Sequence, residues 1–287
     1  MRNLTGRVAI LTGASRGLGV DVARALAKEG CDLALAARSE AELEKVAEEI
    51  RGTGRRAIAV PCDVASADDR RRLVESTLAE FGKIDILVNN AGIELTAFYE
   101  EQAEEEIARL INVNLTAAML LTRAVLPHML ERKSGHIVNM ASMAGKVPVP
   151  YSVPYSTSKA GMIAFTEGIR NEFKGRGVSA SAICPGFVSD AGMYADWERE
   201  TGVKAPLLTR PVSPQRVANN VVKAIRKDRP EMLVFWMPAR GTAALAEVAP
   251  GTFEKVFPVF GSVKVFRKLA EYRHKQERAA SKEAEKV

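Results

Sequence analysis

The sequence predicts an α/β protein with a doubly wound parallel sheet, formed by a single domain with a C-terminal helical extension. Short apolar runs alternate along the chain with longer stretches of helical periodicity, which is the pattern of repeated β–α–β units. A glycine-rich turn follows the first apolar run and precedes an amphipathic stretch. A length of 287 residues suits one such domain with an appendage.

Seven strands are expected, and helices fill most of the intervals between them. In the first interval Val22, Ala25 and Leu26 share one helical face, as an amphipathic helix requires. Right-handed crossovers of this kind give a parallel sheet. The expected strands are residues 8–11, 33–36, 57–60, 86–88, 136–140, 179–183 and 232–235.

The glycine-rich turn has the spacing G-x-x-x-G-x-G, with glycines at Gly13, Gly17 and Gly19. Glycines let the backbone turn tightly and approach a pyrophosphate at a helix N-terminus, where free N–H groups and the helix dipole favour anions. No Gly-Lys-Ser/Thr follows, which argues against a nucleoside-triphosphate P-loop. Taken alone, the same pattern also occurs in ordinary tight turns.

A tyrosine and a lysine four residues apart form the second motif, and a serine precedes them. Tyr155 and Lys159 share one helical face, and Ser142 lies thirteen positions before the tyrosine. A free phenol has a pKa of about 10, and a nearby ammonium is expected to lower it into a range useful for proton transfer. The alternative is a surface pair that arises by chance. Tyr151 is a competing phenol, but it has no lysine four residues on.

With both motifs in view, the chain resembles the short-chain dehydrogenase/reductase family over residues 4–235. The motifs occur in that family's order: the glycine turn, Asp63-Val64, the N-N-A-G segment at 89–92, Asn114, the serine–tyrosine–lysine set, and Pro185-Gly186. The resemblance implies a Rossmann-type fold and the catalytic residues Ser142, Tyr155, Lys159 and Asn114. It implies a cofactor site made of Gly13, Ser15, Arg16, Gly17, Leu18, Gly19, Arg38, Asp63, Val64, Asn90, Ala91, Gly92, Tyr155, Lys159, Pro185, Gly186 and Val188.

The resemblance also implies a mechanism of hydride transfer between a nicotinamide cofactor and a carbonyl carbon. Tyr155 would exchange a proton with the carbonyl oxygen, Ser142 would hold that oxygen, and Lys159 would lower the phenol pKa and bind the ribose. Asn114 would hold a water on a proton relay through the lysine. Structural alternatives remain for the asparagines at 89, 90 and 114, which could tie backbone segments together, and for Ser142, which could be a packing serine.

Charge after the second strand indicates NADP rather than NAD as the cofactor. Ala37 stands where an NAD enzyme usually has an acidic residue, and Arg38 follows it. Arg16 adds a second guanidinium in the glycine turn, and the two could grip a 2′-phosphate. Either arginine alone could be a solvated surface charge. The family's usual threonine after the P-G turn is missing, since Ser189 and Asp190 stand there, so the anchoring of the nicotinamide is in doubt.

Residues 187–212 are expected to form a substrate lid over an apolar pocket, which favours a hydrophobic ketone or its secondary alcohol as substrate. Packing within the lid is the equal alternative for these apolar residues. A non-catalytic NADP-binding sensor or scaffold is the rival function, and nucleic-acid binding is disfavoured because basic residues form no stripe over the core. The apolar residues are Met143, Val147, Val149, Met193, Tyr194, Trp197, Leu207 and Leu208.

Residues 1–236 are assigned to the catalytic domain and residues 237–287 to the extension. Residues 264–287 carry eight Lys/Arg and four Asp/Glu, so this tail holds +4 of the chain's net charge of +6. An amphipathic helix is expected there, which either docks on the domain or a neighbouring subunit, or rests on an anionic membrane surface. Its apolar stripe comprises Val259, Val263, Phe266 and Ala270, with Phe260 and Leu269 alongside.

The remaining features predict a cytoplasmic protein, with peripheral membrane contact through the tail as an option. The N-terminus lacks the apolar stretch of a signal peptide, and no apolar run approaches about 18 residues. Cys31, Cys62 and Cys184 have no disulfide or metal spacing, so a metal site is not expected. The resemblance implies a homodimer or homotetramer that pairs through long helices near residues 104–131 and 155–174.

Overall fold

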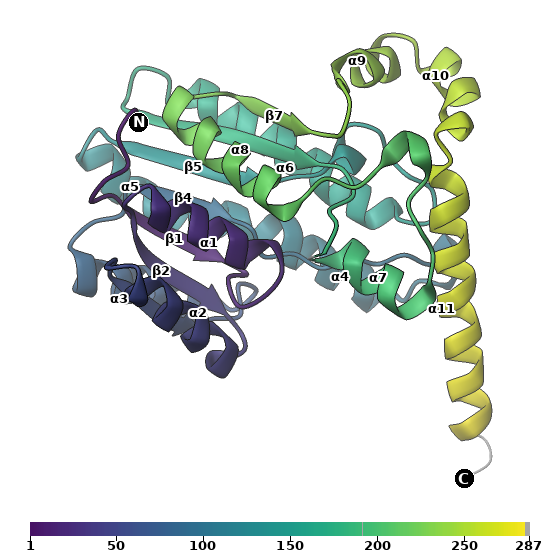
Figure 1. The fold of residues 1–287 in the computed structure, drawn as a ribbon, viewed down its shortest axis with the longest axis horizontal. Coiled ribbons are helices and arrows are strands. Elements are labelled where there is room, and N and C mark those ends of the chain that lie inside the picture. The colour runs from purple at the N-terminus through teal and green to yellow at the C-terminus, as the bar shows by residue number, and fades with distance from the viewer. Residues whose placement is uncertain (191, 285–287) are drawn as a thin grey trace.

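Seven parallel strands form one sheet in the order β3-β2-β1-β4-β5-β6-β7, with helices on both faces (Figure 1). A computed structural model of the protein describes residues 1–190 and 192–284. The doubly wound, Rossmann-type sheet confirms the predicted fold class. The strands are β1 Val8–Thr12, β2 Asp32–Ala37, β3 Ala57–Pro61, β4 Ile86–Asn89, β5 Gly135–Met140, β6 Val178–Pro185 and β7 Glu231–Val234.

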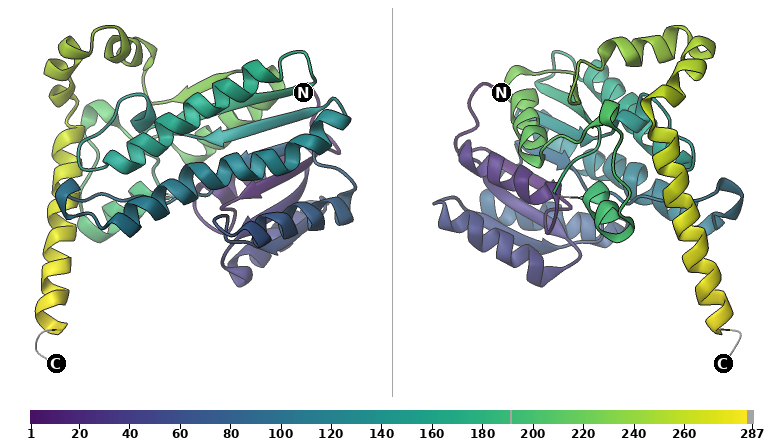
Figure 2. Two further views of the ribbon diagram at one scale, coloured as in Figure 1. Left: turned by 180° about the vertical axis from the view of Figure 1, so that it is seen from behind. Right: turned by 45° about the vertical axis from the view of Figure 1, so that its right-hand side comes forward.

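Each expected strand overlaps an observed one, because strands covered on both faces read as continuous apolar runs. Helices α1, α2 and α8 pack on one face of the sheet, and α3, α5 and α6 cover the other (Figures 1 and 2). The helices of the domain are α1 Leu18–Lys28, α2 Glu40–Gly52, α3 Ala67–Phe81, α4 Glu104–Ile111, α5 Ala117–Glu131, α6 Val153–Glu172, α7 Met193–Thr201 and α8 Pro214–Lys227.

A π-helical turn, Asn112–Thr116, joins α4 to α5, so that residues 104–131 form one long helical stretch. Among the described residues this is the one helix that is long and apolar enough to cross a membrane, which the sequence did not suggest. In the structure α5 packs against β4, β5 and α3 as part of the layer that covers the sheet. A core helix of a soluble protein can have the same length and apolar composition, so these two properties are weak support for a membrane span.

The extension beyond β7 forms several helices rather than one: α9 Arg240–Val248, α10 Pro250–Val256, the 3₁₀ turn Phe257–Phe260 and α11 Ser262–Ala284. Helices α9 and α10 stand at one corner of the domain, and α11 runs from there past α7 (Figures 1 and 2).

Phe266, Leu269 and Ala270 of the apolar stripe predicted for the extension are buried in the structure, and Val265 is buried in place of Val259. The buried face of α11 comprises Val265, Phe266, Leu269 and Ala270, and the first three pack against the domain, whereas Val259 is 69% exposed. The structure therefore agrees with the docking alternative for this helix, and its apolar face is already covered.

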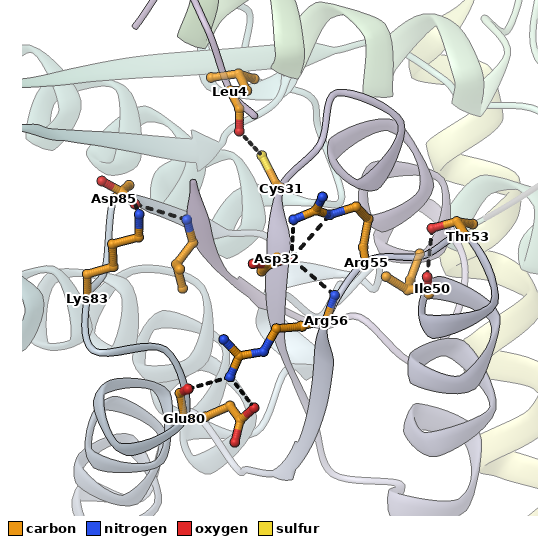
Figure 3. Close-up of polar contacts among 11 residues, drawn as sticks. Leu4, Cys31, Asp32, Ile50, Thr53, Arg55, Arg56, Glu80, Lys83 and Asp85 are labelled. Carbon is orange, nitrogen blue, oxygen red and sulfur yellow. Dashed lines mark hydrogen bonds and ion pairs between the residues drawn. The ribbon is translucent and has the colours of Figure 1, made fainter. Parts of the chain in front are cut away.

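Charged side chains fasten the amino-terminal edge of the sheet (Figure 3). Asp32 begins β2, and its carboxylate accepts hydrogen bonds from the Arg55 guanidinium, at 2.5 Å from Nη2, and from the Arg56 backbone N–H. Asp85 is fully buried before β4 and pairs with Arg7 at 2.8 Å and with Lys83 at 3.7 Å. This edge is opposite to the carboxyl ends of the strands, where the glycine turn lies.

Candidate active site

A cavity of about 710 Å³ lies at the carboxyl ends of the strands, beside the point where the sheet order reverses between β1 and β4. Open α/β sheets bind ligands at this position. The cavity brings together the predicted site residues, with Asn114 as the exception. Those that line it are Gly13, Ser15, Arg16, Gly17, Leu18, Gly19, Arg38, Asp63, Val64, Asn90, Ala91, Gly92, Ser142, Tyr155, Lys159, Pro185, Gly186 and Val188.

The glycine turn is shaped for a ligand at the start of α1. A Cβ atom on Gly19 would lie 2.0 Å from the carbonyl oxygen of Gly13, so no side chain fits there. Gly13 has φ +66°, and a Cβ there would lie 2.9 Å from the Cα of Ala91. Gly17 precedes α1 without a side-chain cap, which leaves the first N–H groups of the helix for an anion.

Asn90 holds the glycine turn in place. Its Nδ2 donates to the carbonyl oxygens of Thr12 at 3.0 Å and Gly13 at 3.1 Å. The Thr12 hydroxyl in turn accepts from the backbone N–H groups of Asn90 and Ala91, both at 3.0 Å. Asn89 is buried and donates to Asn139 at 2.8 Å. These bonds agree with the alternative that Asn89 and Asn90 tie neighbouring segments of the chain together. Asn90 also faces the cavity.

Asn114 is fully buried in the π turn, behind the cavity wall. Its amide exchanges two hydrogen bonds of 2.8 Å with the backbone of Ile93 and donates a third to Ser158 at 3.2 Å. A Cβ on Gly92 would lie 3.3 Å from Asn114 Oδ1 and 3.6 Å from Lys159 Nζ. The Asn114 amide and the Lys159 ammonium therefore both lie close to Gly92. π turns such as the one that contains Asn114 often occur at functional sites.

Helix α6 places Tyr155 and Lys159 on one face, and Ser142 follows β5. Lys159 Nζ lies 5.5 Å from the centre of the Tyr155 ring and donates to the carbonyl oxygen of Met140 at 2.8 Å. The Ser142 hydroxyl accepts from the Ala144 N–H at 3.1 Å. The three side chains therefore face one cavity. Helix α6 positions Tyr155 and Lys159, and the segment after β5 positions Ser142.

The pKa of Tyr155 differs from the sequence expectation. Burial raises the pKa of the phenol above its ordinary value, the charge of Glu94 raises it further, and a hydrogen bond with Ser142 opposes them. Burial also lowers the pKa of Lys159 to about 8, although Glu94 pulls it back up. The expected lowering of the Tyr155 pKa by Lys159 is therefore not seen, because the burial of the phenol is the largest effect on its pKa.

The lid agrees only in part with the expectation. Met193, Tyr194 and Trp197 line the cavity, as do Met143, Val147 and Val149, whereas Leu207 and Leu208 are exposed on the surface. The Ser189 hydroxyl donates to the Val212 carbonyl at 3.4 Å, and Asp190 has φ +60°.

The two arginines differ in their surroundings. Arg16 is exposed and pairs with Asp196 of the lid helix α7, with Nη1 at 3.0 Å from Oδ2. Arg38 is exposed and makes no ion pair with any described residue, so its guanidinium is free for a ligand. Residues 1–190 and 192–284 contain no cluster of His, Cys, Asp or Glu that could hold a metal.

Several cavity residues were not predicted, among them Glu94 and a set from the extension. Glu94 directly follows the N-N-A-G-I segment, and its position between Ile93 and Leu95 was the only signal available in the sequence. The set from the extension forms a roof over the substrate end of the cavity. This roof comprises Met237, Ala239, Thr242, Phe253, Phe257, Phe260, Ser262 and Phe266.

Comparison with known proteins identifies the family. The model of the short chain dehydrogenase family matches residues 7–202. The chain belongs to this family. This short-chain dehydrogenase is 42% identical over 280 residues to ketoacyl reductase HetN of Nostoc sp., an alignment that covers 96% of both chains and so extends into the extension. It is 39% identical over 222 residues to a 3-oxoacyl-[acyl-carrier-protein] reductase of Synechocystis sp., covering 77% of this chain and 90% of the relative.

Solved structures show the same fold. A variant of actinorhodin polyketide ketoreductase with NADPH matches with a TM-score of 0.75 and 32% identity, over 82% of this chain and 97% of that one. A metagenomic short-chain oxidoreductase in complex with NADP matches with a TM-score of 0.68 and 33% identity, over 80% and 97%. The short-chain dehydrogenase described here is thus an oxidoreductase with ketoreductases among its relatives.

Proposed function

We propose that the protein is an NADP-dependent ketoreductase that interconverts a hydrophobic ketone and its secondary alcohol. The observation that carries the proposal is the joint placement of Ser142, Tyr155 and Lys159 in one cavity with an uncapped glycine turn. A sensor or scaffold could bind the cofactor through the turn and Lys159, and it would not need the hydroxyls of Ser142 and Tyr155 for proton transfer. The relatives named ketoacyl reductase support the same reaction class.

The residues present fit NADP. The crowded glycines at 13 and 19 leave backbone where a pyrophosphate would bind, and α1 offers uncapped N–H groups. Ala37 puts no carboxylate at the position where it would repel a 2′-phosphate. Arg38, which has no ion pair with a described residue, supplies a cation. Asp63 and Val64 line the side where the adenine would lie, and NADP or NADPH is present in two similar structures. When bound, the cofactor supplies or accepts the hydride.

The chain's own residues manage the oxygen and its proton. The Ser142 hydroxyl would donate a hydrogen bond to the substrate carbonyl oxygen, and Tyr155 would give that oxygen a proton. The raised pKa of Tyr155 keeps its proton in place until a substrate oxygen that gains negative charge can take it, which suits reduction. Lys159 would hold a ribose hydroxyl, and the buried Asn114 would support the return of a proton through the adjacent ammonium.

A hydrophobic substrate is supported by the lining of the cavity. Lid residues Tyr194 and Trp197 and the roof of the extension enclose its substrate end with aromatic side chains. Apolar surface buried in such a chamber stabilises a bound alkyl or aryl group by about 25 cal/mol per Å². We therefore assign residues 1–236, with the lid 187–212, to cofactor and substrate binding, and residues 237–287 to closing the substrate end.

The test is NADPH oxidation by the Tyr155→Phe variant with a panel of hydrophobic ketones. Loss of the hydroxyl should leave folding and NADPH binding intact and lower turnover by about 10²-fold or more. Tyr151→Phe is the matched control, since that phenol has no lysine four residues on. Turnover that survives in Tyr155→Phe would refute the mechanism, and absence of turnover in the unaltered protein would favour the sensor.

We further propose a homodimer or homotetramer that pairs through α5 and α6. Met119 and Leu120 are exposed apolar residues on α5, and Val153 is exposed at the start of α6. A monomer by light scattering at micromolar concentration would contradict this assembly.

The three cysteines are buried and unpaired, which suits a cytoplasmic location. Peripheral membrane contact would have to use the exposed basic face of α11, since its apolar face is docked.

A further inference from the structure

Glu94 is an acidic side chain in the wall of a cavity that also contains the cationic residues Lys159 and Arg109, and the reaction outlined above does not use it. It lies in the segment that follows β4 and lines the cavity together with Tyr155 and Lys159. Its charge acts on both of them, since it raises the pKa of the phenol and of the ammonium. Glu94 is therefore close enough to the two proposed catalytic residues to act on a substrate that they bind.

The two oxygens of the Glu94 carboxyl group differ in their surroundings. Oε1 accepts hydrogen bonds from the hydroxyls of Ser152 and of Thr96, the latter at 3.0 Å. Oε2 has no hydrogen-bond partner among residues 1–190 and 192–284. Ser152 is fully buried and immediately precedes α6, the helix that carries Tyr155, so Glu94 is fixed relative to the phenol. The Ala97 N–H also donates to the Tyr151 carbonyl at 2.9 Å, which ties the two segments together.

These bonds decide where a proton on Glu94 would be. A carboxyl oxygen that accepts from two hydroxyls has both of its lone pairs in use. While both hydroxyls donate to Oε1, a proton on the carboxyl group is on Oε2, the oxygen without a partner among the described residues. Neutral Glu94 presents an O–H donor to the cavity, and ionised Glu94 presents a bare acceptor.

The surroundings of Glu94 favour its neutral form. Burial raises the pKa of Glu94 to about 7, against the opposing hydrogen bonds of Ser152 and Thr96 and the charge of Lys159. A bound apolar substrate would exclude more water and raise this pKa further. The neutral form also suits turnover, because an anionic Glu94 would oppose the phenolate that forms when Tyr155 gives up its proton.

We propose that Glu94 forms a polar subsite, in which its Oε2–H donates a hydrogen bond to the second carbonyl oxygen of a 1,3-dicarbonyl substrate such as a 3-oxoacyl ester or thioester. The inference rests on the proposed ketone reduction and narrows its substrate. A donor fixed beside Tyr155 needs an acceptor oxygen only a few atoms from the reacting carbonyl, which a 3-oxoacyl group has. The alkyl remainder would lie against Phe253, Phe257 and Phe266 of the roof. A cationic substrate is disfavoured by Lys159.

The test compares ethyl 3-oxooctanoate with its ether analogue, in which CH₂ replaces the ester carbonyl, in NADPH oxidation from pH 6 to pH 8. The readout is the ratio of the two kcat/KM values, in which the ionisation of Tyr155 and Lys159 cancels because both substrates meet the same groups. At pH 6 the ratio should be about 5- to 10-fold higher in the unaltered protein than in Glu94→Ala, the effect of one hydrogen bond. It should fall as the pH rises through about 7, as Glu94 loses its proton.

Glu94→Gln is the decisive variant. Glutamine keeps an acceptor for Ser152 and Thr96 and places an N–H donor where Oε2 was. The preference for the ester should therefore survive in Glu94→Gln and no longer change with pH. A preference that grows with pH and disappears in Glu94→Gln would mean that ionised Glu94 accepts a hydrogen bond from the substrate. An unchanged preference in Glu94→Ala would mean that there is no subsite, and either result overturns the proposal.

Binding measurements separate this inference from the proposed function. The affinities of the Tyr155→Phe variant for the ester and the ether, in the presence of NADPH, can be followed by the fluorescence of Trp197 in the cavity wall. The ratio of the two dissociation constants should change with Glu94→Ala as the kinetic ratio does. If neither compound is turned over by the unaltered protein but this ratio still responds to Glu94, ketone reduction fails and the subsite stands. If the ratio does not respond, the subsite fails whatever the turnover.

Discussion

Replacement of Phe266 by alanine should weaken the docking of α11 and open the substrate end of the cavity. Phe266 is 7% exposed, stacks on Phe187 at 6.0 Å between ring centres and meets Trp197 edge-to-face at 5.8 Å. Burial of a phenylalanine side chain is worth about 1.5–3 kcal/mol, and aromatic pairs add about 0.5–1.5 kcal/mol. Because one side of the ring borders a cavity, we expect a loss near the lower end of the sum, about 2–3 kcal/mol.

Val265 and Leu269 also pack against the domain, so Phe266 is one of three buried apolar anchors of α11. The Arg273–Glu106 and His274–Glu101 pairs are partly exposed, and such pairs contribute about 0–1 kcal/mol each. A loss of about 2–3 kcal/mol lowers the docked fraction by about 30- to 150-fold relative to the detached one. The sheet and the helices that cover it should keep their stability, because α11 can detach locally without unfolding of the domain.

Hydrogen exchange of the backbone amides in α11 measures the docking, and KM for a long-chain ketone measures its effect on the substrate. Both exchange and KM should rise in Phe266→Ala, while the melting temperature of the domain changes little. Val259→Ala is the control, since that side chain is 69% exposed and should change neither quantity. Unaltered exchange and KM in Phe266→Ala would show that the roof does not depend on this ring.

Two further predictions concern the cofactor and the sheet. Arg38→Ala should weaken NADPH binding by about 10- to 100-fold and leave NADH binding nearly unchanged, because a hydrogen bond to a charged group is worth about 1.5–3 kcal/mol. Arg16→Ala should have the smaller effect, since Arg16 must first leave Asp196, and equal losses for both cofactors by titration would contradict the assignment. His136 is buried, and burial lowers its pKa to about 3. Below pH 6.5 this histidine therefore binds a proton in the unfolded chain but not in the native protein. Stability should therefore fall as the pH drops from 6.5 toward 3, by about 1 kcal/mol per unit, and urea unfolding at pH 7 and pH 5 should show a smaller loss in His136→Gln than in the unaltered protein.

The sequence predicted the sheet and the cofactor turn because their signals are local. A strand buried on both faces is a continuous apolar run, and glycines that exclude a Cβ stand within a few residues of each other. The chemistry of Tyr155 was harder to predict, since the direction of its pKa depends on how far burial outweighs a neighbouring ammonium.

Residues distant in sequence were the ones missed. Glu94 is held by Ser152, 58 positions away, so no spacing marks it. The sequence placed Phe266, Leu269 and Ala270 on the buried face of α11, but it could not decide between Val259 and Val265. Both are equally apolar, and only the shape of the domain decides which of them is buried.

The π turn at Asn112–Thr116 sets the phase between two parts of one long helix. Such a turn adds one residue to an α-helix, and each residue rotates the helix by about 100°. Before the turn, Glu106 faces Arg273 of α11, and after it Leu121 and Val125 face the sheet. Deletion of one residue here would straighten the helix and turn these faces apart, so that either Asn114 would leave Ile93 or Glu106 would leave the extension. The number of residues in the turn Asn112–Thr116, more than their identity, therefore keeps Asn114 aligned with the extension that covers the cavity.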